Sequence, residues 1–88
     1  MRGLVIATAV LMSLIPVAGI AGEYGDHCAA GLAIYEMLVQ TDCSVNWADQ
    51  RTGKVYCFSS DNSMEEFLED VDANIAKADG KFIELESN

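Results

Sequence analysis

The stretch CSVNWADQRTGKVYCF, residues 43–58, decides the fold. Its two ends, residues 43–48 and 54–58, carry the β-branched and aromatic residues that are typical of strands. The polar residues between them end on Gly53, which can adopt the left-handed backbone conformation that a short hairpin loop needs. The sequence therefore predicts a β-hairpin with one cysteine in each strand.

The register of this hairpin decides whether Cys43 and Cys57 face each other. Side chains alternate between the two faces along a strand. With Gln50 opposite Lys54 the two cysteines share a face, whereas a slip of one residue places them on opposite faces. The sequence thus permits a disulfide between Cys43 and Cys57 without requiring it.

A helix is predicted upstream of the hairpin, over residues 28–39. Apolar side chains recur along it at spacings of four and three residues, which place them on one face of a 3.6-residue period. They are Cys28, Leu32, Tyr35 and Val39. Residues 23–27, which precede this helix, are polar and are expected to form a loose segment.

A second helix is predicted downstream, beginning at Ser63. The sequence SMEE, residues 63–66, matches a capping box in which the Ser63 hydroxyl caps the helix, with Asp61 and Asn62 as alternative caps. An apolar stripe follows, and Asp79-Gly80 ends the helix. The stripe consists of Met64, Phe67, Leu68, Val71 and Ile75.

Residues 82–85 are predicted to form a third, edge strand or a packed tail. Met37 and Met64 fall at helical spacing and suit the core better than a metal. The aromatic residues expected in the core are Trp47, Tyr56, Phe58 and Phe67. This order of elements predicts a small α+β fold, in which a β-hairpin or a three-stranded sheet packs against two helices.

Residues 1–21 have the pattern of a secretory signal peptide. Arg2 supplies the positive start, residues 4–21 carry no charge, and Gly19 and Ala21 are the small residues that a signal peptidase requires. Cleavage after Ala21 leaves residues 22–88 as a single domain, periplasmic or secreted, in an oxidising compartment. The alternative is an uncleaved anchor, because the uncharged run is about long enough to cross a bilayer.

Residues 22–88 are strongly acidic. They hold four of the five basic residues and all fourteen acidic ones, which leaves a net charge of −10. Nucleic acids and anionic membranes reward clustered lysine and arginine, so neither is an expected partner, and no membrane insertion is expected after signal cleavage. The acidity indicates solubility, or attraction of cations or of a basic partner surface.

Residues 53–71 resemble the YHS domain family, whose pattern runs G-K-x-Y-x-F-C-S-x-x-C-x-x-x-F-x-x-D-P. The glycine, lysine, tyrosine, both phenylalanines, the serine and the aspartate fall in register. Upstream, CAAGL at residues 28–32 is similar to the C-x-x-G-L opening of the same family. The resemblance extends over residues 28–78.

The resemblance implies a hairpin packed on a helix and, in members that carry the cysteines, a site for copper, zinc or mercury. This chain departs from the pattern at the ligands, because Ser59 and Ser63 stand where the family has its two cysteines, and Val71 replaces the proline. The chain is identified as an exported, serine-substituted variant, so the family's metal site does not transfer directly.

The three cysteines allow three interpretations. In the first, two of them, with Cys43 and Cys57 as candidates, form a disulfide that supports a small core, and the third is buried or pairs with a partner chain. In the second, Cys28, Cys43 and Cys57 bind Cu(I) or Zn²⁺ together with His27 or a methionine. In the third, one thiol is reactive. His27 is otherwise expected to be solvated.

No catalytic motif is present, and the only cysteine–histidine pair is the adjacent His27-Cys28, so no enzymatic activity is expected. The expected function is an exported metal-binding module that carries or senses copper or zinc, with no other cofactor. The alternative is a disulfide-stapled accessory protein that docks on an envelope complex without a metal. The expected partner is accordingly a metal ion or an envelope protein.

Overall fold

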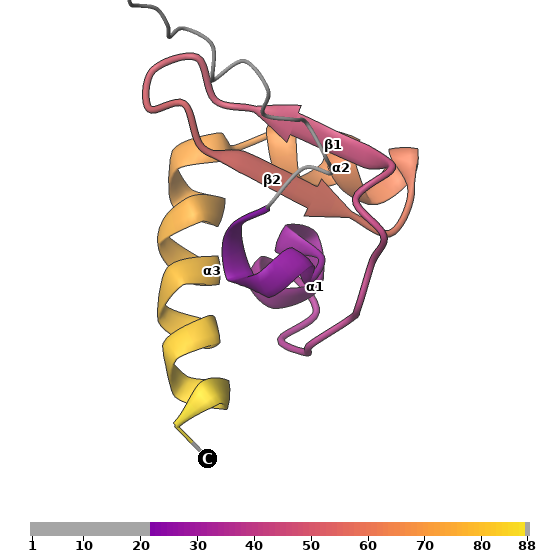
Figure 1. The fold of residues 1–88 in the computed structure, drawn as a ribbon. Helices are drawn as coiled ribbons and strands as arrows, with labels where there is room; N and C mark the ends of the chain where they lie inside the picture. The colour runs from indigo at the N-terminus through magenta and orange to yellow at the C-terminus, as the bar shows by residue number, and fades with distance from the viewer. Residues whose placement is uncertain (1–21, 88) are drawn as a thin grey trace, which may run out of the picture.

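The computed structural model describes residues 22–87, so the predicted signal peptide lies outside the described part of the chain (Figure 1). The elements are a 3₁₀ turn η3 (Glu23–Asp26), helix α1 (Ala29–Ala33), strands β1 (Val45–Ala48) and β2 (Val55–Phe58), and helices α2 (Asp61–Leu68) and α3 (Val71–Glu86). The two strands form one antiparallel sheet. The predicted α+β class is confirmed.

The hairpin forms over the predicted residues, one residue out of register with the pairing of Gln50 and Lys54. Asp49 lies opposite Lys54, and its amide donates to the Lys54 carbonyl at 2.8 Å. Gly53 closes the loop in the predicted left-handed conformation, with φ 80°, and donates to the Asp49 carbonyl at 2.7 Å. The loop therefore begins at Asp49, whose side chain accepts hydrogen bonds from Arg51 of the same loop.

The Asp49 side chain is 2% exposed, and Arg51 of the same loop compensates its negative charge. Arg51 donates to both carboxylate oxygens, each at 3.0 Å, and the pKa of Asp49 falls because of these hydrogen bonds. Arg51 also pairs with Asp72 of α3 at 2.9 Å. The hairpin loop is thereby tied to the first turn of α3.

Helix α1 is much shorter than the helix predicted over residues 28–39. The chain turns out of it because Glu36 adopts a left-handed conformation, with φ 57°, and the Met37 amide donates back to the Gly31 carbonyl at 3.0 Å. A Cβ on Gly31 would lie 3.3 Å from the Met37 carbonyl oxygen. The absence of a side chain at Gly31 therefore lets the returning chain approach α1 closely.

Helix α2 begins two residues earlier than predicted. Its N-cap is Ser60, whose Oγ accepts from the Ser63 amide at 3.1 Å, while Ser63 Oγ accepts from the Ser60 amide at 3.2 Å. This is a capping box with serine at both positions. The predicted cap at Ser63, and the alternatives Asp61 and Asn62, are wrong.

A break separates α2 from α3, where a single helix was expected. The buried Asn74 side chain donates to the Phe67 carbonyl at 2.9 Å, which adds a short hydrogen bond to the longer one of 3.4 Å that this carbonyl accepts from the Asp70 amide. Asp79-Gly80 lies inside α3 instead of ending a helix, and residues 82–85, predicted as a third strand or tail, are helical.

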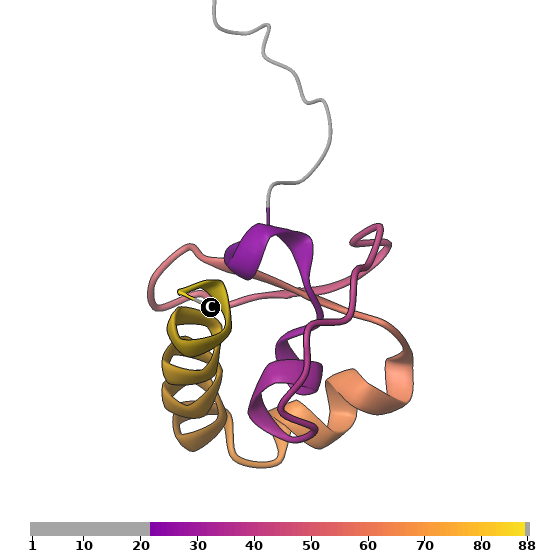
Figure 2. The ribbon, with the colours of Figure 1, turned by 90° about the horizontal axis from the view of Figure 1, so that it is seen from below.

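The core gathers around α1, which packs against α3, α2 and β2 (Figures 1 and 2). The alanines and Gly31 of α1 are all buried, and Ala78 of α3 is fully buried, so small side chains let the two helices approach closely. Tyr56, Phe58 and Phe67 are buried as predicted, whereas Trp47 is only partly buried at the edge.

Candidate functional site

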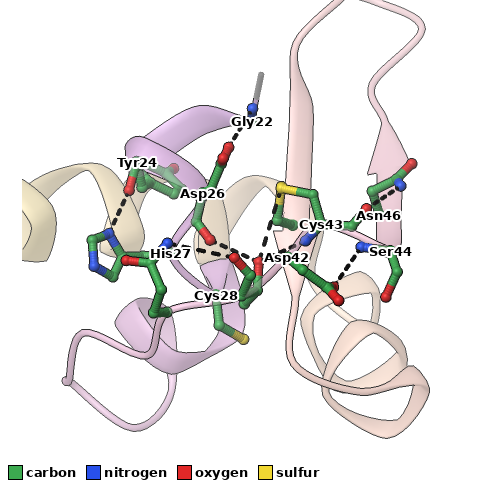
Figure 3. Close-up of a disulfide and its surroundings, with 12 residues drawn as sticks. Gly22, Tyr24, Asp26, His27, Cys28, Asp42, Cys43, Ser44 and Asn46 are labelled. Carbon is green, nitrogen blue, oxygen red and sulfur yellow. Dashed lines mark hydrogen bonds between the residues drawn. A yellow bond between two sulfur atoms is a disulfide. The ribbon is translucent and has the colours of Figure 1, made fainter. Parts of the chain in front are cut away.

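A disulfide joins Cys43 to Cys57 across 14 positions of the sequence (Figure 3). The observed register, with Asn46 paired to Cys57, would place two in-strand cysteines on opposite faces. The bond forms because Cys43 lies before β1 and adopts a left-handed conformation, with φ 61°. Thr41 Oγ1 accepts from its amide at 3.1 Å, and Asn46 donates to its carbonyl at 2.7 Å.

Asp26 lies beside this disulfide, in the turn η3. Its carboxylate oxygen and the two sulfur atoms lie within 4.8 Å of one another, which is the only such group of three His, Cys, Asp or Glu side chains within residues 22–87. The Gly22 amide donates to Asp26 Oδ1 at 2.7 Å. Sequence reasoning missed Asp26 because residues 23–27 were expected to be loose, and the left-handed conformations of Tyr24 and Asp26 leave no signal in the sequence.

Cys28 is the one free cysteine, and it is buried. Its backbone pairs with that of Cys57 in an isolated β-bridge, but its thiol lies outside the group formed by Asp26, Cys43 and Cys57. Its Sγ accepts the amides of Gly31 at 3.4 Å and Ser59 at 3.3 Å. The hydroxyls of Ser59 and Ser63 lie 3.7 and 3.9 Å from the sulfur and 3.5 Å from each other. Cys28, Ser59 and Ser63 thus form a triangle, here called the serine–thiol cluster.

The structure does not bring the predicted metal ligands His27, Cys28, Cys43 and Cys57 together into one group. His27 Nδ1 is 2.8 Å from the Tyr24 carbonyl oxygen, and its ring lies beside Phe82. The His27 ring and the Cys28 sulfur point in different directions, and neither points at the disulfide (Figure 3). His27 is thus half-buried and held in place, where a solvated side chain was expected.

The second feature is an exposed apolar segment between α1 and β1, residues 34–38 with the sequence IYEML, here called the docking segment. Its four large apolar side chains are exposed: Ile34 by 38%, Tyr35 by 52%, Met37 by 52% and Leu38 by 40%. The expected burial of Met37 is therefore wrong. Isolated exposed apolar residues are ordinary, but here four lie within five consecutive residues and form a continuous exposed apolar segment.

The docking segment is held in place by hydrogen bonds to α1 and α2 and by an ion pair to α3. The amides of Ile34 and Tyr35 donate to carbonyls of α1, and the Tyr35 hydroxyl donates to Glu66 of α2 at 2.7 Å. This hydrogen bond to a carboxylate raises the pKa of Tyr35. Glu36 forms an ion pair with Lys81 of α3 at 3.4 Å. The segment therefore presents its side chains from a fixed backbone.

Within residues 22–87 the structure contains no pocket for a small ligand, and none of its helices is long and apolar enough to cross a membrane. The fold and the site define a small, acidic, disulfide-linked α+β domain. No protein-family model matches the chain, and neither a curated protein nor a solved structure matches it. Membership of the YHS family stays a prediction.

Proposed function

We propose that the protein is an exported, disulfide-stapled interaction module that docks on a larger envelope protein through residues 34–38. The observation that supports this proposal is the exposure of Ile34, Tyr35, Met37 and Leu38 on a fixed backbone. Ordering costs oppose binding, so a segment that is already held in its bound conformation retains more of its contact energy. Large apolar and aromatic side chains are also the residues that dominate binding at interfaces.

The charge around the docking segment specifies the kind of partner. Glu36 is 71% exposed, Glu66 binds Tyr35 at the surface, and Lys81, the cation that approaches Glu36, also pairs with Glu84. Acidic groups therefore border an apolar centre, on a chain whose residues 22–88 carry a net charge of −10. The complementary partner is a protein with an apolar surface bordered by lysine and arginine.

Photo-crosslinking in the cells that make the protein tests this proposal. A photoreactive amino acid at Met37 is expected to give one discrete adduct with an envelope protein, and Ile34→Ser combined with Leu38→Ser is expected to reduce its yield at least tenfold. Thermal unfolding of the protein should stay nearly unchanged, because these side chains are exposed in the free molecule.

Ile83 provides the matched control. It is 69% exposed and large, but it lies two residues from Lys81 and hence about 200° around α3 from the side that meets Glu36. The same photoreactive residue at position 83 is expected to give no discrete adduct. Equal yields from positions 37 and 83, or an adduct insensitive to the serine substitutions, would refute docking through residues 34–38.

Metal binding is the second candidate function, and the group formed by Asp26, Cys43 and Cys57 favours it. Reduction of the disulfide by a dithiol would release two thiols beside a carboxylate, and thiolate with carboxylate is a ligand set that Zn²⁺ accepts. The oxidised protein has no thiol there, so this function depends on the redox state of the pair. It differs from the predicted ligand set in using Asp26 in place of His27 and Cys28.

Zinc titration of the protein in its two redox states tests this candidate. The form reduced with a phosphine is expected to bind one Zn²⁺ per chain, and the oxidised form none. Asp26→Asn should weaken binding, whereas Cys28→Ala, the matched control, should leave it unchanged because Cys28 lies outside the group. Absence of binding by the reduced protein, or loss of binding in Cys28→Ala, would rule out this site.

A further inference from the structure

We propose that the chain is cut between Ala21 and Gly22, and that the ammonium group released on Gly22 binds the Asp26 carboxylate and closes residues 22–26 over the Cys43–Cys57 disulfide. Hydrolysis by a signal peptidase adds water across the amide, leaving a carboxylate on Ala21 and an amine on Gly22 that takes up a proton. Residues 22–26 are here called the N-terminal clasp. The inference rests on export, which is part of the proposed function, and is independent of the docking segment.

The distance between Gly22 and Asp26 fits such an ion pair. The Gly22 nitrogen already lies 2.7 Å from Asp26 Oδ1, the length of a charge-assisted hydrogen bond. In the uncut chain this nitrogen is an amide with a single hydrogen. After cleavage it carries a positive charge and three hydrogens at the same position, so the contact gains an ionic component without any movement of the carboxylate.

Only glycine fits at this position. A Cβ on Gly22 would lie 2.2 Å from Cys57 Sγ, closer than side chains approach one another, and 3.2 Å from Cys43 Sγ, which is a tight contact. The backbone of Gly22 is ordinary, with φ −92°, so the requirement comes from space and not from conformation. The first residue after the predicted cleavage site is therefore the residue type that lets a chain terminus lie against the disulfide.

The backbone that carries the Asp26 carboxylate is held in place by bonds that do not involve Gly22. The Asp26 carbonyl accepts from the Thr41 amide at 3.2 Å and from Thr41 Oγ1 at 2.7 Å. The buried Tyr24 fixes the other side of the turn, because its hydroxyl donates to Asp79 of α3 at 2.7 Å. Burial and this contact raise the pKa of Tyr24, which keeps its hydroxyl a donor. The ion pair therefore forms with little further loss of conformational entropy in this turn.

The N-terminal clasp lies against Cys57 Sγ and so restricts access to the disulfide. Disulfide exchange requires a thiolate to approach one of the two sulfur atoms. Cys57 is fully buried and Cys43 is 5% exposed, and Gly22 lies against both sulfur atoms. Opening of the clasp should therefore limit the rate at which a dithiol reduces the bond.

Intact mass and amine reactivity test the cleavage and the ion pair. The exported protein is expected to have the mass of residues 22–88 with one disulfide. Its α-amine should react several-fold faster with an acylating reagent in Asp26→Asn than in the native protein, because the amine then lacks the carboxylate that binds it at 2.7 Å. Glu23→Gln, an acid of the same turn that does not bind Gly22, is the control and should react like the native protein.

The reduction rate tests the covering of the disulfide. Gly22→Ala is expected to be reduced by dithiothreitol several-fold faster than the native protein, whereas Gly80→Ala should match the native rate because a Cβ there meets nothing within 4 Å. A mass that begins at a residue other than Gly22, an α-amine indifferent to Asp26→Asn, or equal reduction rates would each overturn the inference. None of these results bears on crosslinking through position 37, so the two proposals fail separately.

Discussion

Replacement of both Cys43 and Cys57 by alanine is expected to lower the free energy of unfolding by about 3 kcal/mol. The disulfide closes a loop with a sequence separation of 14, and it restricts the unfolded chain accordingly. Alanine is the suitable substitute because both positions are buried, and its side chain introduces no polar group that would need a partner. The magnitude is large for this domain, since small single domains are stable by only about 5–15 kcal/mol in total.

Thermal unfolding measures this loss. A shift of about 4–8 °C per kcal/mol for a domain of this size predicts a melting temperature roughly 12–24 °C lower in the double variant. Dithiothreitol provides an internal control, because it should bring the native protein close to the melting temperature of the variant and leave the variant itself unaffected. A native protein whose unfolding is insensitive to complete reduction would show that the bond contributes nothing to stability.

The hairpin and the aromatic residues of the core could be predicted from the sequence because both depend on local sequence pattern. Strand-type residues flank a polar loop that ends on Gly53, and the structure forms two strands there. Tyr56, Phe58 and Phe67 are buried, and the Phe67 ring packs against the other two. The hairpin follows from strand-type composition around a polar loop, and the burial of Phe67 follows from the apolar stripe at helical spacing.

The ends of the helices could not be predicted from the sequence, because apolar periodicity continues through points where the chain turns. Leu32 and Val39 fit a continuous helix, yet the left-handed Glu36 lies between them, stabilised by a bond from the next residue to α1. Likewise Val71 and Ile75 extend the apolar stripe of α2 past the break that Asn74 stabilises. In both places hydrogen bonds within the folded chain stabilise the turn, and apolar spacing does not encode them.

The candidate sites likewise combine features that the sequence predicts with features that depend on the folded backbone. Cys43 and Cys57 were named as a possible pair, but the reason that they meet is the left-handed backbone of Cys43 outside the strand. Asp26 was overlooked because its approach to the sulfur atoms depends on the fold of a turn with three consecutive residues at positive φ. The docking segment was expected to be helical and partly buried, so its exposure had no signal in the sequence.

Substitution of both Ser59 and Ser63 by cysteine is expected to create a zinc site with Cys28. The three side-chain atoms of the serine–thiol cluster are separated by 3.7, 3.9 and 3.5 Å. Zinc–sulfur bonds of about 2.3 Å in tetrahedral geometry place neighbouring sulfur atoms about 3.8 Å apart. The cluster therefore has the size of one face of a zinc–thiolate tetrahedron, with the native hydroxyls at two of its corners.

The double variant is expected to bind one Zn²⁺ per chain and to gain about 4 kcal/mol of stability when the free metal exceeds the dissociation constant a thousandfold. The native protein, with its disulfide intact, should show no such gain, because Cys28 is its only thiol. Cobalt provides a direct readout, since thiolate coordination gives strong charge-transfer absorption. Intact mass should still show a single disulfide, which confirms that Ser59→Cys and Ser63→Cys have not paired with each other.

A third substitution makes the test specific to the geometry. Cys28→Ala, added to the two cysteines, should remove most of the metal affinity, because the remaining pair occupies only one edge of the tetrahedron. If the triple variant binds zinc as tightly as the double variant, then Cys28 is not aimed at the two serine positions as described. If the triple variant binds zinc more weakly, then Cys28 and the two serines occupy positions from which three thiolates can bind one metal ion. This chain then differs from the cysteine-bearing pattern that it resembles by serine in place of cysteine at two of these positions.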